Sequence, residues 1–237
     1  MEIVQSNTQA MLIIESNEEA QWYFWRKPWA NTIAYIPLKS DLLDHSWNDI
    51  SLTNNWVTLN TSQISWRCCW YFNWKAMRWT CSKIQSWPET ASVWVKFTSI
   101  STSSWCWIFG RWDLSTQATR AFMLYTSSKN SSWALAVSIY SWDIVSTTKP
   151  SLNVWHLCTA TRSSSNMYYL YLDWQLLTSW SLSPWTAWQT VMIGRSPNAQ
   201  YEYSYWYMAE AILENRQWSA SEILEYYNKT KKYFWIS

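Results

Sequence analysis

Glycine is almost absent from this chain. Only Gly110 and Gly194 are written in 237 residues, where average usage gives about 17. Such a content excludes collagen-like and glycine-rich low-complexity proteins, and it leaves turns without the residue that adopts positive φ at no steric cost. Tryptophan, usually rare, occurs 24 times. Several tryptophans directly follow a turn-forming residue between strand-like runs, as in Asn55-Trp56, Asn73-Trp74 and Asp173-Trp174.

These tryptophans occupy positions that are typical of glycine. A type I′ hairpin turn needs positive φ at both central residues, which favours Asn-Gly and Asp-Gly, and Pro184-Trp185 and Trp87-Pro88 occupy the positions of Pro-Gly and Gly-Pro turns. We interpret most of the tryptophans as glycines of the native protein, from a gene in which UGA encodes glycine but was translated as tryptophan. The alternative is a tryptophan-rich protein with indoles that stack on sugars or form an aromatic core, which explains the number but not the placement.

Charge and long apolar runs are also scarce. Charged residues make up 14% of the chain, and 18 basic against 16 acidic residues give a net charge of +2. Because no Lys/Arg block occurs, we expect no nucleic-acid partner. The apolar run at residues 11–14 is too short for a signal sequence or a membrane span, so no membrane insertion is expected. Another export route, assembly inside a cell and a misplaced gene start remain open alternatives.

Metal-binding residue patterns are missing too. With only His45 and His156, and with no C-x-x-C pair, the sequence contains no zinc motif. Buried free thiols are the expected state of the five cysteines, and one disulfide between Cys81 and either Cys68 or Cys69 is the alternative. The full set is Cys68, Cys69, Cys81, Cys106 and Cys158.

Short strand-like runs separated by turn residues dominate the chain from residue 32 onward. This pattern is typical of a β-sandwich or barrel, and residues 1–30 are interpreted as an N-terminal extension or linker before a domain at 31–237. Tyr168-Tyr169-Leu170-Tyr171-Leu172 alternates as a half-buried strand and predicts a hairpin around Asp173-Trp174. The expected strands are 32–38, 50–59, 69–73, 92–98, 108–111, 121–126, 134–140, 154–162, 167–173, 190–195 and 207–214.

One helix is predicted near the C-terminus. Ser219 and Glu222 form a capping-box pattern, in which each side chain satisfies the other residue's backbone amide. Apolar residues then recur at helical spacing, and lysines follow near the C-terminal end, where cations suit the helix dipole. We expect this helix to close one end of the sandwich.

A series of segments over residues 32–235 resembles the motifs of one family once glycine replaces the turn tryptophans. The segments are a strand at 32–38, a turn at 44–49, Trp70-Tyr71-Phe72-Asn73-Trp74 as a second hairpin, strands at 92–96 and 153–157, a turn at 172–175, a strand at 192–195, and a closing strand and helix at 209–223. Together they resemble a concanavalin A-like, laminin-G-type jelly-roll domain. In this comparison Trp94, Trp155 and Trp218 are genuine structural tryptophans.

The resemblance implies an all-β fold: a two-sheet antiparallel jelly-roll sandwich, concanavalin A-like, with a short C-terminal helix. Some jelly rolls of this kind are glucanases with two carboxylates on one strand. Glu210 and Glu214 come closest to that arrangement, but the family's E-x-D-x-x-E pattern is absent. A Ser/His/Asp set would need His45 or His156, and His156 matches a structural position of the family. We therefore expect no enzyme.

The resemblance instead implies recognition or adhesion at a cell or particle surface, with a glycan or a surface protein as partner and carbohydrate as the expected ligand. Arg111 and Asp113 lie on an expected ligand-side rim, where Asp113 is a candidate Ca²⁺ ligand, and a turn-capping role is the simpler alternative for Asp113. The candidate sugar-stacking loop contains Tyr201, Glu202, Tyr203 and Tyr205, whose tyrosines alternatively cover the sandwich edge. No cofactor other than Ca²⁺ is expected.

An extracellular, cell-surface or virion location follows from this reading. The alternative function is a structural component of a virion tail, a pilus or a surface layer, and within it the domain belongs to a larger assembly.

Overall fold

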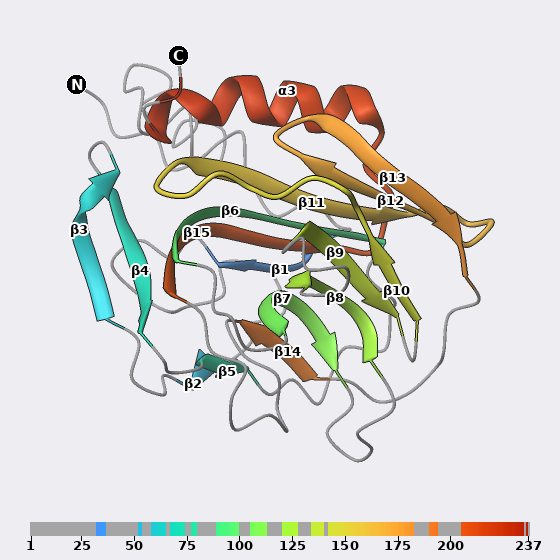
Figure 1. Cartoon of the computed structure of the whole chain (residues 1–237), viewed down its shortest axis with the longest axis horizontal. Coiled ribbons are helices and arrows are strands. Elements are labelled where there is room, and N and C mark those ends of the chain that lie inside the picture. The colour runs from blue at the N-terminus through green and yellow to red at the C-terminus, as the bar shows by residue number, and fades with distance from the viewer. Residues whose placement is uncertain are drawn as a thin grey trace, which may run out of the picture.

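The computed structural model describes residues 32–36, 52–53, 58–64, 67–73, 77–79, 89–99, 105–112, 120–127, 134–139, 142–182, 190–193, 205–234 and 236. The 1–30 extension expected from the sequence lies outside these residues. Within them the chain forms two antiparallel sheets and one C-terminal helix (Figure 1). The predicted all-β sandwich with a short C-terminal helix is therefore confirmed.

The first sheet contains eight of the described strands: β1 (Thr32–Ile36), β3 (Thr58–Ile64), β4 (Arg67–Asn73), β6 (Thr90–Ser99), β11 (Trp155–Arg162), β12 (Met167–Leu172), β13 (Gln175–Ser181) and β15 (Tyr205–Glu214). Their order is β13-β12-β11-β6-β15-β4-β3. One edge of β15 pairs with β6, while its other edge pairs with β4 and then with β1. Strand β15 thus joins β1, β3 and β4 to the rest of the sheet.

The second sheet contains seven described strands: β2 (Leu52–Thr53), β5 (Met77–Trp79), β7 (Trp105–Trp112), β8 (Arg120–Ser127), β9 (Ala134–Ile139), β10 (Trp142–Val145) and β14 (Thr190–Ile193). Their order is β10-β9-β8-β7-β14-β5-β2. The run expected as one strand at 50–59 is divided between the sheets, since β2 and β3 belong to different ones. The hairpin expected at 70–74 is also wrong, because β4 pairs with β3 and β15 and β5 joins the second sheet.

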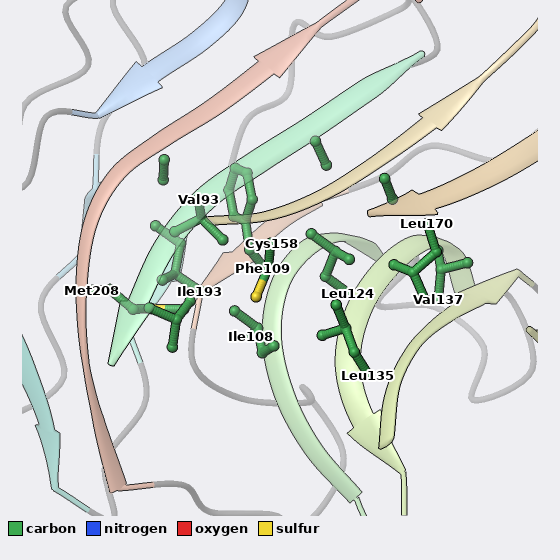
Figure 2. Close-up of a cluster of buried hydrophobic side chains, with 14 of the residues drawn as sticks. Val93, Ile108, Phe109, Leu124, Leu135, Val137, Cys158, Leu170, Ile193 and Met208 are labelled. Carbon is green, nitrogen blue, oxygen red and sulfur yellow. The ribbon is translucent and has the colours of Figure 1, made fainter. Parts of the chain in front are cut away.

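The main core fills the space between the two sheets. Alternate residues of β6 and β11 point into it, so Val93 and Cys158, which are register partners on these strands, face Ile108 and Leu135 of the second sheet (Figure 2). Apolar burial of this kind is the main driving force for folding. The alternation predicted from the sequence therefore decides which side chains form the core.

A second apolar layer lies on the opposite face of the first sheet. It is covered by α3 (Ala220–Thr230) and the short 3-10 helix η2 (Lys231–Phe234), which Figure 1 shows on the side of that sheet away from the second one. Trp94 and Leu157, the residues next to the core-facing pair on β6 and β11, pack there against Tyr227 and Phe234. The expectation that the helix closes one end of the sandwich is therefore wrong: its apolar face covers this tryptophan-bearing layer.

The hairpin predicted around Asp173 forms between β12 and β13, but its turn differs from the expected type. Leu172 pairs with Gln175 across a two-residue loop, and only Asp173, at φ 55°, takes a positive φ. Trp174 is not among the described residues with positive φ. The Trp174 amide also donates to the Leu172 carbonyl at 3.0 Å, around Asp173, so the turn differs from the type I′ turn, which needs positive φ at both central residues. The steric argument for glycine at position 174 is therefore wrong for this turn.

Candidate functional site

The ligand-side residues expected from the sequence fall mostly outside the described part of the chain. The residues outside it are Asp113, Tyr201, Glu202 and Tyr203. Arg111 lies in β7 of the second sheet, opposite Val191 and Phe122, and Tyr205 begins β15 of the first sheet, opposite Asn73 and Ser99. The two described members thus belong to different sheets, and the binding role of the whole set stays a prediction.

The three tryptophans expected to be structural are all buried. The Trp94 indole stacks on Phe234 at 4.3 Å between ring centroids and donates its Nε1–H to Thr230 Oγ1 at 3.1 Å. Trp155 packs against the same phenylalanine. The Trp218 Nε1–H donates to Glu214 Oε2 at 2.7 Å. These contacts hold the C-terminal helix on the first sheet, so the indoles have a structural role in this position.

The capping box predicted at Ser219 is confirmed. Ser219 Oγ accepts from the Glu222 amide at 3.3 Å, and the Ser219 amide donates to Glu222 Oε2 at 2.8 Å. Burial by itself raises the pKa of Glu222, but the hydrogen bonds from Ser219 and from the Arg216 guanidinium outweigh it, so the pKa lies below its usual value. The carboxylate therefore stabilises the start of the helix in its ionised form.

The carboxylates closest to a glucanase pair are engaged inside the protein. Glu210 is buried, sits at φ 57° in a bulge of β15, and accepts a hydrogen bond from the Tyr35 hydroxyl at 2.9 Å. Glu214 is also buried, and it pairs with Trp218 and with Arg216 Nε at 3.0 Å. Catalysis of glycoside hydrolysis needs an acid and a base or nucleophile that reach the sugar. These two side chains instead join β15 to its neighbours.

A polar relay that the sequence did not predict lies where β11 begins. His156 Nδ1 is 2.9 Å from Asp173 Oδ2, and His156 Nε2 is 2.8 Å from the Ser151 Oγ. Asp173 is held in place because its Oδ1 accepts from the Leu157 amide at 2.9 Å and its own amide donates to the Leu157 carbonyl at 2.7 Å. Ser151, His156 and Asp173 thus form a continuous chain of hydrogen bonds, which we call the Ser151 relay.

The direction of each hydrogen bond in the Ser151 relay follows from the chemistry of its members. An ionised carboxylate only accepts, so His156 Nδ1 carries the proton that it donates to Asp173. In the neutral ring Nε2 is then the acceptor, and the Ser151 hydroxyl donates to it. The ring itself is buried, whereas Ser151 is exposed. The relay therefore ends in a serine oxygen at the protein surface.

Two apolar side chains flank the exposed end of the Ser151 relay. Leu152 is 42% exposed and Val154 is 45% exposed, although both are large hydrophobic residues. Between them Asn153, at φ 62°, donates its amide to the Phe97 carbonyl at 2.7 Å. This bond attaches the loop that carries Ser151 to strand β6.

The signal for the Ser151 relay was present in the sequence but not decisive. The sequence predicts His156 in a strand, as a structural residue, and Asp173 in a hairpin turn. The backbone has both features, and the two side chains meet because β12 returns beside β11. Sequence spacing alone does not reveal that Ser151, on the preceding loop, lies within hydrogen-bond distance.

Cys158 follows His156 on the same strand but belongs to the core and not to the Ser151 relay. It is a buried free thiol on the inner face of the first sheet (Figure 2). Burial raises its pKa well above the usual value, and the negative charge of Asp173 adds to this effect. The thiol is therefore kept in its unreactive protonated form.

In the described part of the chain, no group of three or more His, Cys, Asp or Glu side chains has a metal-binding arrangement. Nor do the described helices include one with the length and apolarity needed to cross a membrane.

Several solved structures share this fold. The binding domain of Paraclostridial Mosquitocidal Protein 1 matches with a TM-score of 0.67 at 13% identity, over 84% of this chain and 52% of that one. The binding domain of botulinum neurotoxin serotype D matches with a TM-score of 0.63 at 15% identity, over 84% and 52%. The receptor binding domain of botulinum neurotoxin type G gives 0.62 at 13%, over 85% and 52%.

No protein-family model matches the chain, and no curated protein matches its sequence. The chain spans about half the length of the solved structures named above. At these identities the likeness concerns the fold alone. The protein has the β-sandwich architecture found in these toxin binding domains.

Proposed function

We propose that this chain is a recognition module, non-catalytic toward its ligand, that binds a molecule displayed on a cell or particle surface. The observation that carries the proposal is the fold, which is shared over most of the chain with domains described as binding or receptor binding domains of toxins. Because one fold hosts many functions, this step is an analogy. An extracellular or surface location belongs to the same proposal.

The buried carboxylates support recognition over glycoside hydrolysis. Glu210 accepts a hydrogen bond from Tyr35 of the same sheet and Glu214 accepts one from Trp218, which precedes α3, and both carboxylates are almost fully buried. A carboxylate committed in this way is not free to protonate a glycosidic oxygen or attack a sugar. In this proposal the ligand is held without cleavage of its glycosidic bonds.

Carbohydrate is the ligand class that we propose, with the resemblance of the sequence motifs to concanavalin A-like, laminin-G-type domains as its rationale. The proposed binding residues remain Arg111 in β7 and Tyr205 at the start of β15, together with Asp113, Tyr201, Glu202 and Tyr203. Asp113 is the proposed ligand of a Ca²⁺ ion, which binds carboxylate and carbonyl oxygens.

The reading of UGA as glycine is also part of this proposal. Trp94, Trp155 and Trp218 have structural contacts in the described chain, whereas Trp174 and Trp180 are 43% and 63% exposed. The buried Trp206 has an Nε1–H without a hydrogen-bond partner among the described residues, and an unsatisfied buried donor is costly. Sequencing of the gene tests the point directly, since UGG is expected at positions 94, 155 and 218 and UGA at nearly all others.

The binding experiment compares both forms of the protein on an array of glycans, with and without calcium. We expect retention on a subset of glycans by the form that carries glycine at the UGA positions. Glu202→Gln should weaken retention, while Glu225→Gln, an exposed glutamate on α3, should leave it unchanged. Asp113→Asn should abolish any calcium dependence.

The opposite outcome favours the alternative function. If no glycan is retained and Glu202→Gln behaves like its control, a structural role in a virion tail, a pilus or a surface layer becomes the better explanation. Self-association of the purified chain into ordered assemblies would then be the positive sign of that role.

A further inference from the structure

We propose that the Ser151 relay makes Ser151 a reactive nucleophile, able to accept an acyl group from an activated ester. The proposal goes beyond recognition, which needs no covalent step, and either can fail without the other. It depends on no tryptophan, so it holds for the glycine form and the tryptophan form alike. Three features of the relay carry it.

The first feature is the order of the groups. A histidine removes the proton of an attacking serine when one ring nitrogen donates to a carboxylate and the other accepts from the serine hydroxyl. Here both distances, 2.9 Å and 2.8 Å, are within hydrogen-bond range without any bound ligand. His156 is therefore placed to act as the general base for Ser151.

The second feature is the fixed position of the Asp173 carboxylate. Asp173 is fixed through both its carboxylate and its amide to Leu157, on the strand that also carries His156. These two contacts with the Leu157 backbone are sufficient to hold the hairpin against β11. The hydrogen bond from Asp173 to the His156 imidazole is therefore not needed for that structural role. Asp173 acts through His156 and is a positioning residue, since it selects the tautomer with Nε2 free to accept.

The third feature is the difference in exposure along the relay. The His156 side chain is 10% exposed and that of Asp173 is 26% exposed, while Ser151 is exposed on the loop that also carries the exposed Leu152 and Val154. A substrate therefore reaches Ser151 Oγ while the base stays largely shielded. Exposed apolar residues on the same loop suit the acyl part of a carboxylic ester.

The reaction conserves atoms and protons with ester and water as its reactants. Ser151 Oγ bonds to the carbonyl carbon, its proton passes to His156 Nε2, and the alcohol leaves with that proton. Water then attacks the acyl-serine and gives one proton to His156, which returns it to Ser151 as the carboxylic acid departs. Because the site is open, we expect turnover only for activated esters such as p-nitrophenyl acetate.

A fluorophosphonate probe tests the nucleophile directly. Attack forms an Oγ–P bond, breaks the P–F bond and releases fluoride, while the serine proton goes to His156. We expect intact mass spectrometry to show one adduct, and peptide mapping to place it on Ser151. Ser151→Ala should abolish the adduct. Ser165→Ala is the matched control, because Ser165 is another exposed serine, whose hydroxyl lies 2.8 Å from the Ser163 hydroxyl.

Two further variants separate a chemical role from a structural one. His156→Ala should slow labelling at least about a hundredfold, the usual contribution of a general base, and added imidazole should restore part of the rate. Asp173→Asn retains a residue that tolerates positive φ, so the turn persists. It should lower the maximal labelling rate while the probe concentration for half-maximal rate stays unchanged.

Failure has a clear form. If the folded protein, checked by its melting curve, gains no adduct on Ser151, or if Ser151 and Ser165 label equally, the relay is a structural tie only and the proposal is overturned. Absence of imidazole rescue in a folded, slowly labelled His156→Ala variant would equally contradict the role of His156 as base.

Discussion

Single indoles illustrate what sequence context specifies at the scale of the residue. Trp94, Trp155 and Trp218 have apolar or helix-capping neighbours rather than turn formers, and each is buried as predicted. Trp174 shows the limit of the same reasoning. The residues Asp-x between two strands specify a hairpin but not its turn class, and here the positive φ falls on Asp173.

The hydrogen bond of Trp218 gives a prediction at this scale. Trp218→Phe keeps an aromatic ring but removes the donor to the buried Glu214 carboxylate, so the free energy of unfolding should fall by about 1–3 kcal/mol. Urea denaturation measures the change. Trp180→Phe is the control, because that indole is 63% exposed, and its loss should be much smaller. Equal losses for the two variants would contradict the structural role of the Trp218 indole.

Local patterns predicted the elements well where a residue acts on its immediate neighbours. The capping box defined the start of α3 correctly, because Ser219 and Glu222 interact within one turn. The position of that helix was predicted incorrectly. Its partner layer contains Trp94 and Leu157 from β6 and β11, and periodicity within a helix does not reveal which distant residues cover its apolar face.

The capping box predicts a pH dependence of stability. The pKa of Glu222 is lowered in the folded protein, so its contribution is present above the unfolded value of about 4.3 and is lost as the pH falls through the lower folded value. Glu222→Gln should therefore reduce the free energy of unfolding at pH 7 and have less effect at pH 3. Urea titrations at both values measure this.

A neutral residue on the same helix provides the control for that experiment. Leu224→Ala removes no charge from α3, so its effect should be similar at pH 7 and pH 3. A Glu222→Gln effect that is as large at pH 3 as at pH 7 would show that the carboxylate charge contributes nothing to the cap.

For the whole molecule, the fold class was predictable and the strand order was not. Alternation and turn spacing indicated a sandwich, but they do not encode that the chain changes sheets between β4 and β5. The Ser151 relay was unpredictable for a similar reason. His156 lies on β11 and Asp173 in the turn that follows β12, and these two strands become neighbours only in the folded sheet. Hydrogen-bond distance is a property of that arrangement.

Glycine substitution tests the whole fold at once. We expect a chain with glycine at 21 positions, that is 24 tryptophans less the three at 94, 155 and 218, to melt cooperatively and at a higher temperature than the written chain. The glycine interpretation assigns roughly 1–3 kcal/mol of strain to each large side chain that stands at a glycine turn, so a few such sites would equal a typical stability of about 5–15 kcal/mol. Calorimetry on both forms measures the difference. Matching cooperative transitions would reject the glycine interpretation.

The position of β15 in the first sheet has a consequence for synthesis on the ribosome. Strands β1, β3 and β4 are synthesised early, yet among the described strands they connect to β6 through β15, which is synthesised after all the others. A chain released before β15 is made has unpaired strand edges, which aggregate or are degraded. Completion of the first sheet thus depends on synthesis of β15.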